Sequence, residues 1–325
     1  MNLVTVKEAA KQALSQKKVT FVIGYTKGSY GFRVAPCFVQ NEAEAEKLLF
    51  SPLCDLSLVN YLAVEKNTPL EKCGKSPEQK IGIFVRGCDS RAINQILSEK
   101  GIIREELIII GIPCHGVIDL KKLENRFPEV LDQAEAEEKE GKYTIRFGEK
   151  SFEVNKEEVL SDKCKHCAYP TPLLYDLLIG EKVQGKEDTY EDIKPREEAS
   201  REEKWDFWRN EFSRCIRCYA CRNACPLCYC ENCIVERLSP QWVKRSVNAT
   251  ENVIYHLSRA FHLAGRCAGC GECERVCPVN LPLMLLNRKL EKDVKSLFNF
   301  TSGIDSDQKQ FLTTYNLEDT GEFIL

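Results

Sequence analysis

The sequence has 325 residues, enough for two domains, and apolar residues make up 43% of it. Its 46 basic and 49 acidic residues leave a net charge of −3, which argues against nucleic acid or an anionic membrane as the partner. No apolar run is long enough to span a bilayer, and the N-terminus lacks the apolar core of a signal peptide, so we expect a cytoplasmic protein.

Residues 1–180 have the pattern of an α/β domain. Short apolar runs rich in β-branched residues predict strands at Val19–Ile23, Ile81–Val85 and Leu107–Ile110. A helical spacing over Ser90–Lys100 separates the second and third strands, which predicts a βαβ unit with a parallel strand pair. We therefore expect a small parallel or mixed sheet with flanking helices.

Two further elements are predicted before a charged segment. Asp119–Glu140 is interpreted as a charged helix, and Tyr143–Phe147 and Phe152–Asn155 are expected to pair as a hairpin. Residues 181–204 follow, with 15 charged residues out of 24, and we interpret them as a solvated linker or an exposed helix.

A third region, mainly α-helical in pattern, covers residues 205–295 and is followed by a C-terminal tail, 296–325. One of its helices has an apolar stripe that runs into Cys267. The stripe consists of Val253, Leu257, Phe261 and Ala264. The histidines of this helix, His256 and His262, are not taken as ligands, because most such histidines are ordinary core or surface residues.

Cysteine is the outlier in composition. There are 18 cysteines, and 11 of them lie between Cys215 and Cys277. Disulfide frameworks belong mostly to small secreted domains, and nothing in the sequence points to secretion. Clustered cysteines in a reducing compartment therefore indicate metal binding or redox chemistry.

Two copies of the motif C-x2-C-x2-C-x3-C-P give the most specific signal. In bacterial ferredoxins with two 4Fe–4S clusters, three cysteines of each copy wrap one cluster and the fourth reaches the other. The motif predicts one cluster on Cys215, Cys218, Cys221 and Cys277, and a second on Cys267, Cys270, Cys273 and Cys225. Two zinc sites are the alternative, since C-x2-C is also a zinc spacing, but two complete copies with their prolines favour clusters.

The 42-residue separation of the motifs and their helical flanks depart from a compact ferredoxin. In both respects the region resembles the α-helical ferredoxin modules of heterodisulfide reductases and of succinate dehydrogenase-type iron–sulfur subunits. Between the motifs lie Cys228, Cys230 and Cys233. Three thiols cannot complete a tetrahedral site alone, so they join a site of another domain, bind zinc or are simply buried thiols.

Five cysteines of the α/β domain form a less regular group. Cys88 and Cys114 each follow a predicted strand, at the edge where open α/β sheets bind ligands. Cys164 and Cys167 form a C-x2-C pair, and Cys54 is expected to precede a helix. These thiols could supply the four ligands of a third 4Fe–4S cluster; alternatively, two or three of them are core cysteines.

Three signatures in this domain are similar to one family. GCDSR around Cys88, IPCHG around Cys114 and the KCxxC segment followed by LLYDLLIG resemble the β subunits of coenzyme F-420 (deazaflavin) hydrogenases and dehydrogenases, including formate dehydrogenases. The resemblance covers about residues 20–180 and implies a flavin, a 4Fe–4S cluster and electron transfer between a partner subunit and a two-electron carrier. The cysteines that it matches are Cys88, Cys114, Cys164 and Cys167, with Cys54 as a further candidate.

The implied flavin, FAD, would lie against the strand ends. The glycine-rich segment GYTKGSYG is the candidate for its phosphate-facing loop, although it lacks the full dinucleotide fingerprint and could be only a hairpin. The candidate cofactor-binding residues are Gly24, Lys27, Gly28 and Gly31. The dicluster module is C-terminal here, whereas many family members carry theirs N-terminally or lack one, so the use of deazaflavin stays open.

These features together predict an iron–sulfur electron-transfer subunit of a larger anaerobic oxidoreductase. Its partners would be subunits of dehydrogenase, hydrogenase or heterodisulfide reductase type, and its cofactors two 4Fe–4S clusters, a third in the α/β domain, and FAD. No catalytic residue is assigned, because no nucleophile–base arrangement is evident. The alternatives are a stand-alone flavoenzyme that reduces deazaflavin or NAD, and a zinc-stabilised scaffold subunit.

Overall fold

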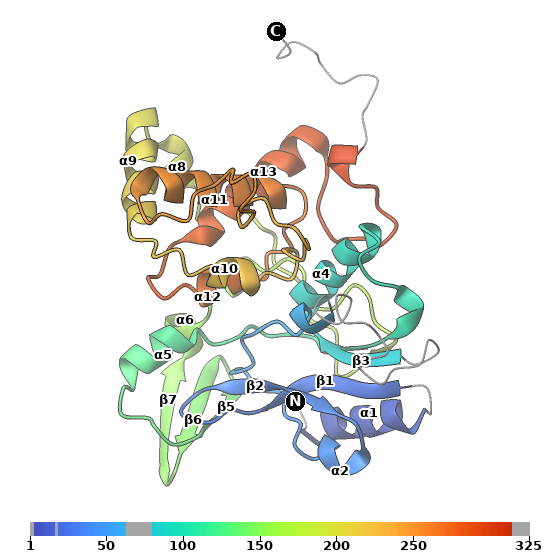
Figure 1. Ribbon diagram of the computed structural model, residues 1–325. Coiled ribbons are helices and arrows are strands. Elements are labelled where there is room, and N and C mark those ends of the chain that lie inside the picture. Colours follow the sequence, from blue (N-terminus) through green and yellow to red (C-terminus); the bar gives the residue numbers. More distant parts are fainter. Residues whose placement is uncertain (1–2, 17–18, 63–79, 314–325) are drawn as a thin grey trace.

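The computed structural model describes residues 3–16, 19–62 and 80–313. Figure 1 shows two stacked parts, an α/β part below and a helical part above that contains both ferredoxin motifs. The last residues of the predicted C-terminal tail, 314–325, lie outside the described residues. Within the described part of the chain, no helix combines the length and the apolar character needed to cross a membrane.

A five-stranded mixed sheet forms the centre of the α/β part, in the order β2-β1-β3-β4-β8. β1 pairs antiparallel with β2, whereas β1, β3, β4 and β8 are parallel to one another. The strands are β1 (Val19–Lys27), β2 (Val34–Val39), β3 (Lys80–Val85), β4 (Leu107–Gly111) and β8 (Leu177–Leu178). The three strands predicted from apolar runs are confirmed.

Helix α4 (Gly87–Ser98) connects β3 to the parallel strand β4, which confirms the predicted βαβ unit. In Figure 1 it lies between the sheet and the helical part, whereas α1 (Leu3–Ser15) lies on the other side of the sheet. Ala92, Ile93 and Ile96 are buried at helical spacing and join the main apolar core. One end of α4 therefore lies close to the cysteine-rich helical part.

A buried ion pair holds the start of α4. The Arg86 guanidinium donates to the Asp89 carboxylate (Nε–Oδ2 2.9 Å) and to the carbonyls of Cys54 and Leu56, and the Ser57 hydroxyl also donates to Asp89. Both charged side chains are buried. Burial alone would raise the pKa of the Asp89 carboxyl, but Arg86 and the Ser57 hydroxyl together lower it more, so the net pKa lies below its ordinary value.

We expect Asp89→Asn to lower the free energy of unfolding by about 3–5 kcal/mol, because the Arg86 charge would stay buried without its counterion. Urea unfolding checks this value. The matched control is Ser57→Ala, which removes one hydrogen bond to the same carboxylate and is expected to cost about 1 kcal/mol. Equal losses in the two variants would contradict a dominant role of the ion pair.

A second, three-stranded antiparallel sheet flanks the first. It consists of β5 (Ala134–Lys139), β6 (Lys142–Phe147) and β7 (Lys150–Asn155). The predicted hairpin is confirmed as β6 and β7.

The helix predicted over Asp119–Glu140 is wrong beyond its first turns. Helix α5 spans only Leu120–Arg126, and the chain then enters β5. The physical reason is a change of period, because alanines and charged residues alternate in AEAEEK and Ala136 packs with Ile145 in a small core. A strand places every second side chain on that core, which a helix would not do.

The helical part is built on α9 (Arg201–Ser213), α11 (Ala249–Leu263) and α13 (Leu283–Phe298). The short helices α10 (Ala220–Asn223) and α12 (Glu272–Arg275) lie inside the two ferredoxin motifs. The other short elements are α2 (Glu42–Ala45), η2 (Arg104–Glu106), α6 (Lys156–Val159), α7 (Asp162–Lys165), α8 (Lys194–Glu198) and η3 (Phe311–Thr313).

The predicted helix before Cys267 is confirmed as α11, but its predicted apolar stripe is only partly buried. Phe261 is 62% exposed, whereas the polar residues Asn252, His256 and Arg259 are buried. The reason is that this face of α11 packs against the cysteine loops, whose backbone carbonyls accept hydrogen bonds from Asn252 and Arg259.

The charged segment 181–204 and the chain that follows α13 both pack against other parts of the protein. In the charged segment 181–204, Asp188 and Asp192 form ion pairs with Arg288 of α13, so the segment packs on the helical part. After α13 the chain returns to α4, where Arg91 donates to the Ser302 carbonyl (Nη2–O 3.0 Å).

Candidate metal centres

Four cysteines from three segments line one cavity at the carboxyl edge of the main sheet. Cys88 lies in the first turn of α4, Cys114 follows β4, Cys164 lies in α7, and Cys167 follows that helix. The cavity has a volume of about 240 Å³. We call these four cysteines the N-terminal site.

Cys54 is not among the residues that line this cavity. It is fully buried in the main apolar core beside Leu58 and Val59, and its sulfur accepts a hydrogen bond from the Ser51 N–H (3.4 Å). The structure thus brings together four of the five predicted N-terminal cysteines and places Cys54 in the core.

The thiols of the N-terminal site are half-buried and close to one another. Burial, with a smaller contribution from neighbouring charges, raises the pKa of Cys88 to about 12 and that of Cys114 to about 11. Such thiols keep their protons near neutral pH until a metal displaces them. Soft sulfur donors of this kind suit iron–sulfur clusters or zinc.

The first quartet consists of Cys215, Cys218, Cys221 and Cys277, as the crossed motif predicts. Cys215, Cys221 and Cys277 are buried in one core, and the latter two raise the pKa of Cys215 after burial, the main cause. Cys218 is exposed. The structure therefore brings Cys277, from the second motif, to cysteines of the first.

The second quartet consists of Cys267, Cys270, Cys273 and Cys225. Burial raises the pKa of the three cysteines from the second motif, and Cys225 is close enough to each of them to raise it further. The fourth cysteine of the first motif thus lies with the first three of the second.

The two cysteine loops share one backbone conformation. The residues on both sides of the middle cysteine have positive φ in each loop: Arg217 (55°) and Tyr219 (59°) around Cys218, and Gly269 (66°) and Gly271 (71°) in the second motif. A non-glycine residue in this region costs about 1–2 kcal/mol. Retention of the conformation at Arg217 and Tyr219 fits a loop shaped to hold a ligand.

The three cysteines between the motifs do not share a site. Cys228 packs with the main core, Cys233 packs with the core of the first quartet, and Cys230 is exposed. A hydrogen bond with Cys228 lowers the pKa of Cys225 to about 6.

A zinc ion and a 4Fe–4S cluster require different spacings of their cysteine ligands. Among the described residues, no group of three or more His, Cys, Asp or Glu side chains is arranged to hold one ion. A zinc ion draws its sulfurs to about 2.3 Å from one point. A 4Fe–4S cluster spreads four thiolates over four irons.

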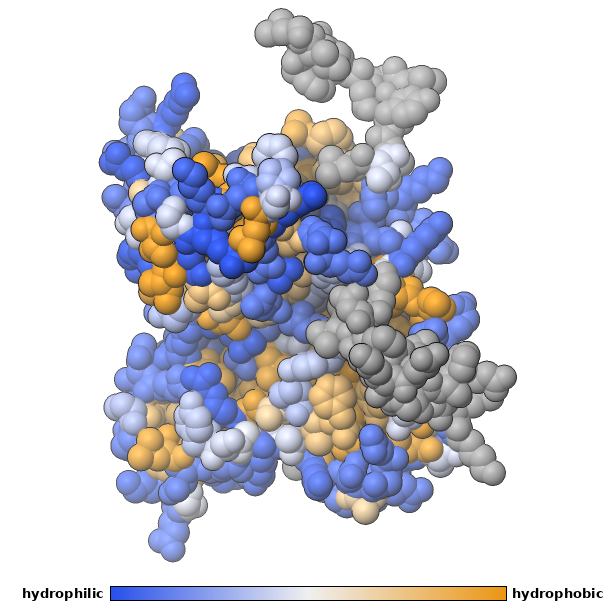
Figure 2. Space-filling model, viewed as in Figure 1, coloured by the Kyte–Doolittle hydropathy of each residue, from blue (hydrophilic) through white to orange (hydrophobic). Residues whose placement is uncertain are grey.

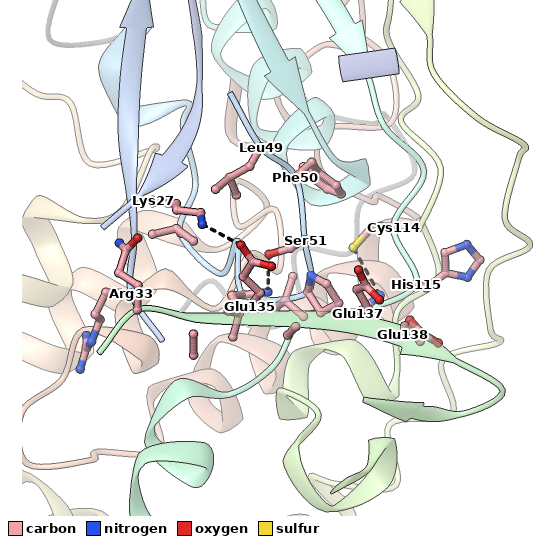
Figure 3. A pocket seen from close by; sticks show the side chains of 18 of the residues that line it. Lys27, Arg33, Leu49, Phe50, Ser51, Cys114, His115, Glu135, Glu137 and Glu138 are labelled. Carbon is pink, nitrogen blue, oxygen red and sulfur yellow. Dashed lines mark hydrogen bonds and ion pairs between the residues drawn. The ribbon is translucent and has the colours of Figure 1, made fainter. Parts of the chain in front are cut away.

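A larger cavity, of about 550 Å³, adjoins the N-terminal site. The two cavities share the lining segment 114–117. In Figure 3, Lys27 and Arg33 lie toward one end of the larger cavity, Cys114 and His115 lie toward the other, and β5 runs along one side.

The glycine-rich segment forms the end of β1 and the hairpin that leads into β2. Among the four predicted cofactor-binding residues, Lys27 lines the larger cavity, where its ammonium pairs with Glu135 (Nζ–Oε1 2.6 Å). Gly24, Gly28 and Gly31 are not lining residues. Because residues 119–140 were predicted as a helix, strand β5, which lines one side of the larger cavity, was missed. The alternation in AEAEEK indicated this strand.

The N-terminal site adjoins the second quartet through Lys163. This side chain lines the cysteine cavity, and its ammonium donates to the Cys270 carbonyl (2.6 Å). Gly269, two residues after Cys267, also lines the cavity. Sequence reasoning missed Lys163, since nothing in the motif spacing indicates which side chains lie between sites.

Two family models match the chain, over ranges that overlap at residues 211–225. A family model described as "4Fe-4S dicluster domain" matches residues 211–281. A second model, for the C terminus of the beta subunit of coenzyme F420 hydrogenase/dehydrogenase, matches residues 78–225. The first range includes all eight cysteines of the two quartets, and the second includes the N-terminal site but not Cys54.

Two archaeal proteins are similar over most of the chain. The F420-dependent formate dehydrogenase subunit beta of Methanocaldococcus jannaschii is 24% identical over 359 residues, which cover 91% of this chain and 90% of that protein. The F420-dependent formate dehydrogenase 1 subunit beta of Methanococcus maripaludis is 25% identical over 291 residues, covering 71% and 74%. Among solved structures, a chain of the xenon-derivatised F420-reducing [NiFe] hydrogenase complex from Methanosarcina barkeri has a TM-score of 0.41 and 14% identity, covering 51% of this chain and 59% of that one.

Proposed function

Because the chain joins a domain of the coenzyme F420 hydrogenase/dehydrogenase β-subunit family to a 4Fe–4S dicluster domain, we propose that it is the flavin-containing electron-relay subunit of an F420-dependent formate dehydrogenase. The resemblance inferred from the cysteine signatures is confirmed by these two domains. That the protein works under anaerobic conditions and in the cytoplasm stays a prediction from the sequence.

The observation that carries the proposal is the order of the sites in space. The larger cavity meets the N-terminal site at Cys114, and the N-terminal site meets the second quartet at Lys163. The second quartet meets the first where α10 contacts α12. Cys273 of the second quartet also lies close enough to Cys221 of the first for Cys221 to raise its pKa, although other causes are larger. Four adjoining sites in one row provide a route for electrons through the chain.

The donor sets fit three iron–sulfur clusters. Each set offers four cysteines; of the twelve, five are buried, six are half-buried and Cys218 is exposed. A chain loaded in this way would hold about twelve irons, four for each 4Fe–4S cluster. We assign the ligands of the third cluster to Cys88, Cys114, Cys164 and Cys167, without Cys54.

The larger cavity fits a flavin in size and place. Cofactor sites typically have volumes of about 300–1,000 Å³, and this cavity opens onto Cys114 of the N-terminal site. Lys27 and Arg33 are the cations that a flavin phosphate would contact, in exchange for their ion pairs with Glu135 and Glu124. A bound flavin would supply the change from one-electron to two-electron chemistry.

The opposite end of the row reaches the surface of the helical part, where Cys218 is exposed, Ile216 is 54% exposed and Trp242 is 65% exposed. On the face of the helical part that Figure 2 draws, apolar side chains lie among hydrophilic ones. Arg217 donates to the Lys244 carbonyl (2.8 Å), which holds these two segments together. We propose that the formate-oxidising partner subunit docks on this surface and exchanges electrons with the first quartet.

Anaerobic oxidation of reduced coenzyme F420, with benzyl viologen as the final acceptor, tests the proposed function on the chain loaded with iron, sulfide and flavin. We expect turnover with reduced F420 and none with NADH. Turnover with NADH and none with reduced F420 would indicate that NADH, and not F420, is the carrier. If neither donor is oxidised by a fully loaded chain, the flavin-linked relay is wrong.

A further inference from the structure

Arg259 of α11 is a buried cation between the two quartets. Its side chain is 6% exposed, and the guanidinium donates to the Cys221 carbonyl in the first quartet (Nη2–O 2.7 Å). It also lies close enough to the Cys225 and Cys228 thiols to act as a hydrogen-bond donor, and its charge acts on Cys273. The guanidinium therefore contacts or faces residues of both quartets.

Lys163 holds the equivalent place at the other junction of the row. Its ammonium donates to the Cys270 carbonyl in the second quartet, and it lines the cavity of the N-terminal site. The sulfurs of Cys88 and Cys164 are close enough to favour its positive charge. A Cβ atom added at Gly271 would lie 2.5 Å from its Cδ, so the side chain is packed tightly against the second loop.

Among the described residues, no carboxylate forms an ion pair with either cation, and the charges that favour the charged form of Arg259 are those of cysteines. Glu272, whose charge acts on Lys163, is paired with Arg275 (Oε2–Nη2 2.7 Å). Arg91 lies near the same junction but is paired with Glu291 (Nη2–Oε1 3.0 Å). Because a buried charge such as that of Arg259 is costly unless it is compensated, the arrangement fits anions in the cysteine sites beside it.

We propose that Arg259 and Lys163 are junction cations, each of which raises the reduction potentials of the two clusters that it separates. This inference rests on the proposed function, since it requires the three clusters. Every reduction adds one electron to a site that already carries four thiolates, and a nearby fixed positive charge stabilises the added electron. Charge and hydrogen bonding near the sulfurs are established determinants of cluster potentials.

The inference is specific because each cation lies between two of the three cluster sites. Arg259 faces the first and second quartets, so its charge is expected to act on both of their clusters and not on that of the N-terminal site. Lys163 faces the N-terminal site and the second quartet, so its charge is expected to act on those two and not on the first. The cluster of the second quartet is the one that both cations influence.

The test is a redox titration of the full chain, purified without oxygen and followed by electron paramagnetic resonance. Arg259→Met and Lys163→Met remove the charges, and the controls Arg259→Lys and Lys163→Arg keep them. For each affected cluster we expect the ratio of reduced to oxidised protein at a fixed potential to fall about tenfold, a shift of about 59 mV for one electron. Each neutral variant is expected to shift two of the three clusters, with one shifted cluster in common, and each charged control is expected to stay near the parent.

Unchanged potentials in both neutral variants, at full iron content, would overturn the inference and leave the proposed function intact. Equal shifts of all three clusters would also overturn it, because they would indicate a general change in structure. If Arg259→Met loses iron, Lys163→Met decides the outcome alone, since the half-buried lysine can be shortened without opening the core. A parent protein without iron and sulfide would instead overturn the proposed function.

Discussion

Replacing Cys277 with alanine is expected to reduce the iron content of the anaerobically purified chain from about twelve to about eight per chain, because one 4Fe–4S cluster loses a ligand. The lost cluster is expected to be that of the first motif, although Cys277 belongs to the second. The structure supports this crossed assignment because Cys277, like Cys221, lies close enough to Cys215 to raise its pKa.

Double variants separate the crossed arrangement from an uncrossed one. Cys215→Ala combined with Cys277→Ala is expected to keep about eight irons, since both ligands belong to one cluster. Cys267→Ala combined with Cys277→Ala is expected to keep about four, since these ligands belong to different clusters. The reverse result in the two double variants would contradict the crossed assignment.

A comparable loss is expected in the α/β domain. Cys88→Ala is expected to remove about four irons, because Cys88 lines the cavity of the N-terminal site with three further cysteines. Cys54→Ala is the matched control, a buried cysteine of the same domain that does not line the cavity, and it is expected to keep about twelve. Iron and acid-labile sulfide analysis of the two variants checks both values.

One result for the control Cys54→Ala would contradict the assignment of the ligands. Loss of iron from Cys54→Ala, with full iron in one of the other four alanine variants, would place Cys54 in the ligand set. Cys54→Ala is otherwise expected to affect only packing, because it removes one sulfur from a closed apolar core.

The sequence predicts the fold best where signals are local. Apolar runs rich in β-branched residues locate β1, β3 and β4, and the helical spacing between the last two gives α4. The ferredoxin motif is similarly local, since its spacing specifies which thiols wrap a cluster. Both kinds of signal depend on neighbours within a few residues, and for this reason they can be read without the tertiary structure.

What the sequence could not supply depends on contacts between distant segments. Residues 119–140 were interpreted as a charged helix, so β5, which forms one wall of the larger cavity, was missed. Arg259 gave no signal as a polar residue on a helix with an apolar stripe, because only the folded loops surround it with sulfur atoms. Cys54 was a further candidate beside the four cysteines that the family signatures match, and its depth in the core separates it from Cys88.

The central claim is an electron relay through three 4Fe–4S clusters and a flavin, and the most direct measurement is the content of iron, acid-labile sulfide, zinc and extractable flavin in protein purified without oxygen. The relay predicts about twelve irons, as many sulfides, one flavin and no stoichiometric zinc per chain. About eight irons without flavin would leave only the dicluster module and remove the N-terminal site from the account. Zinc in place of iron would contradict electron transfer altogether.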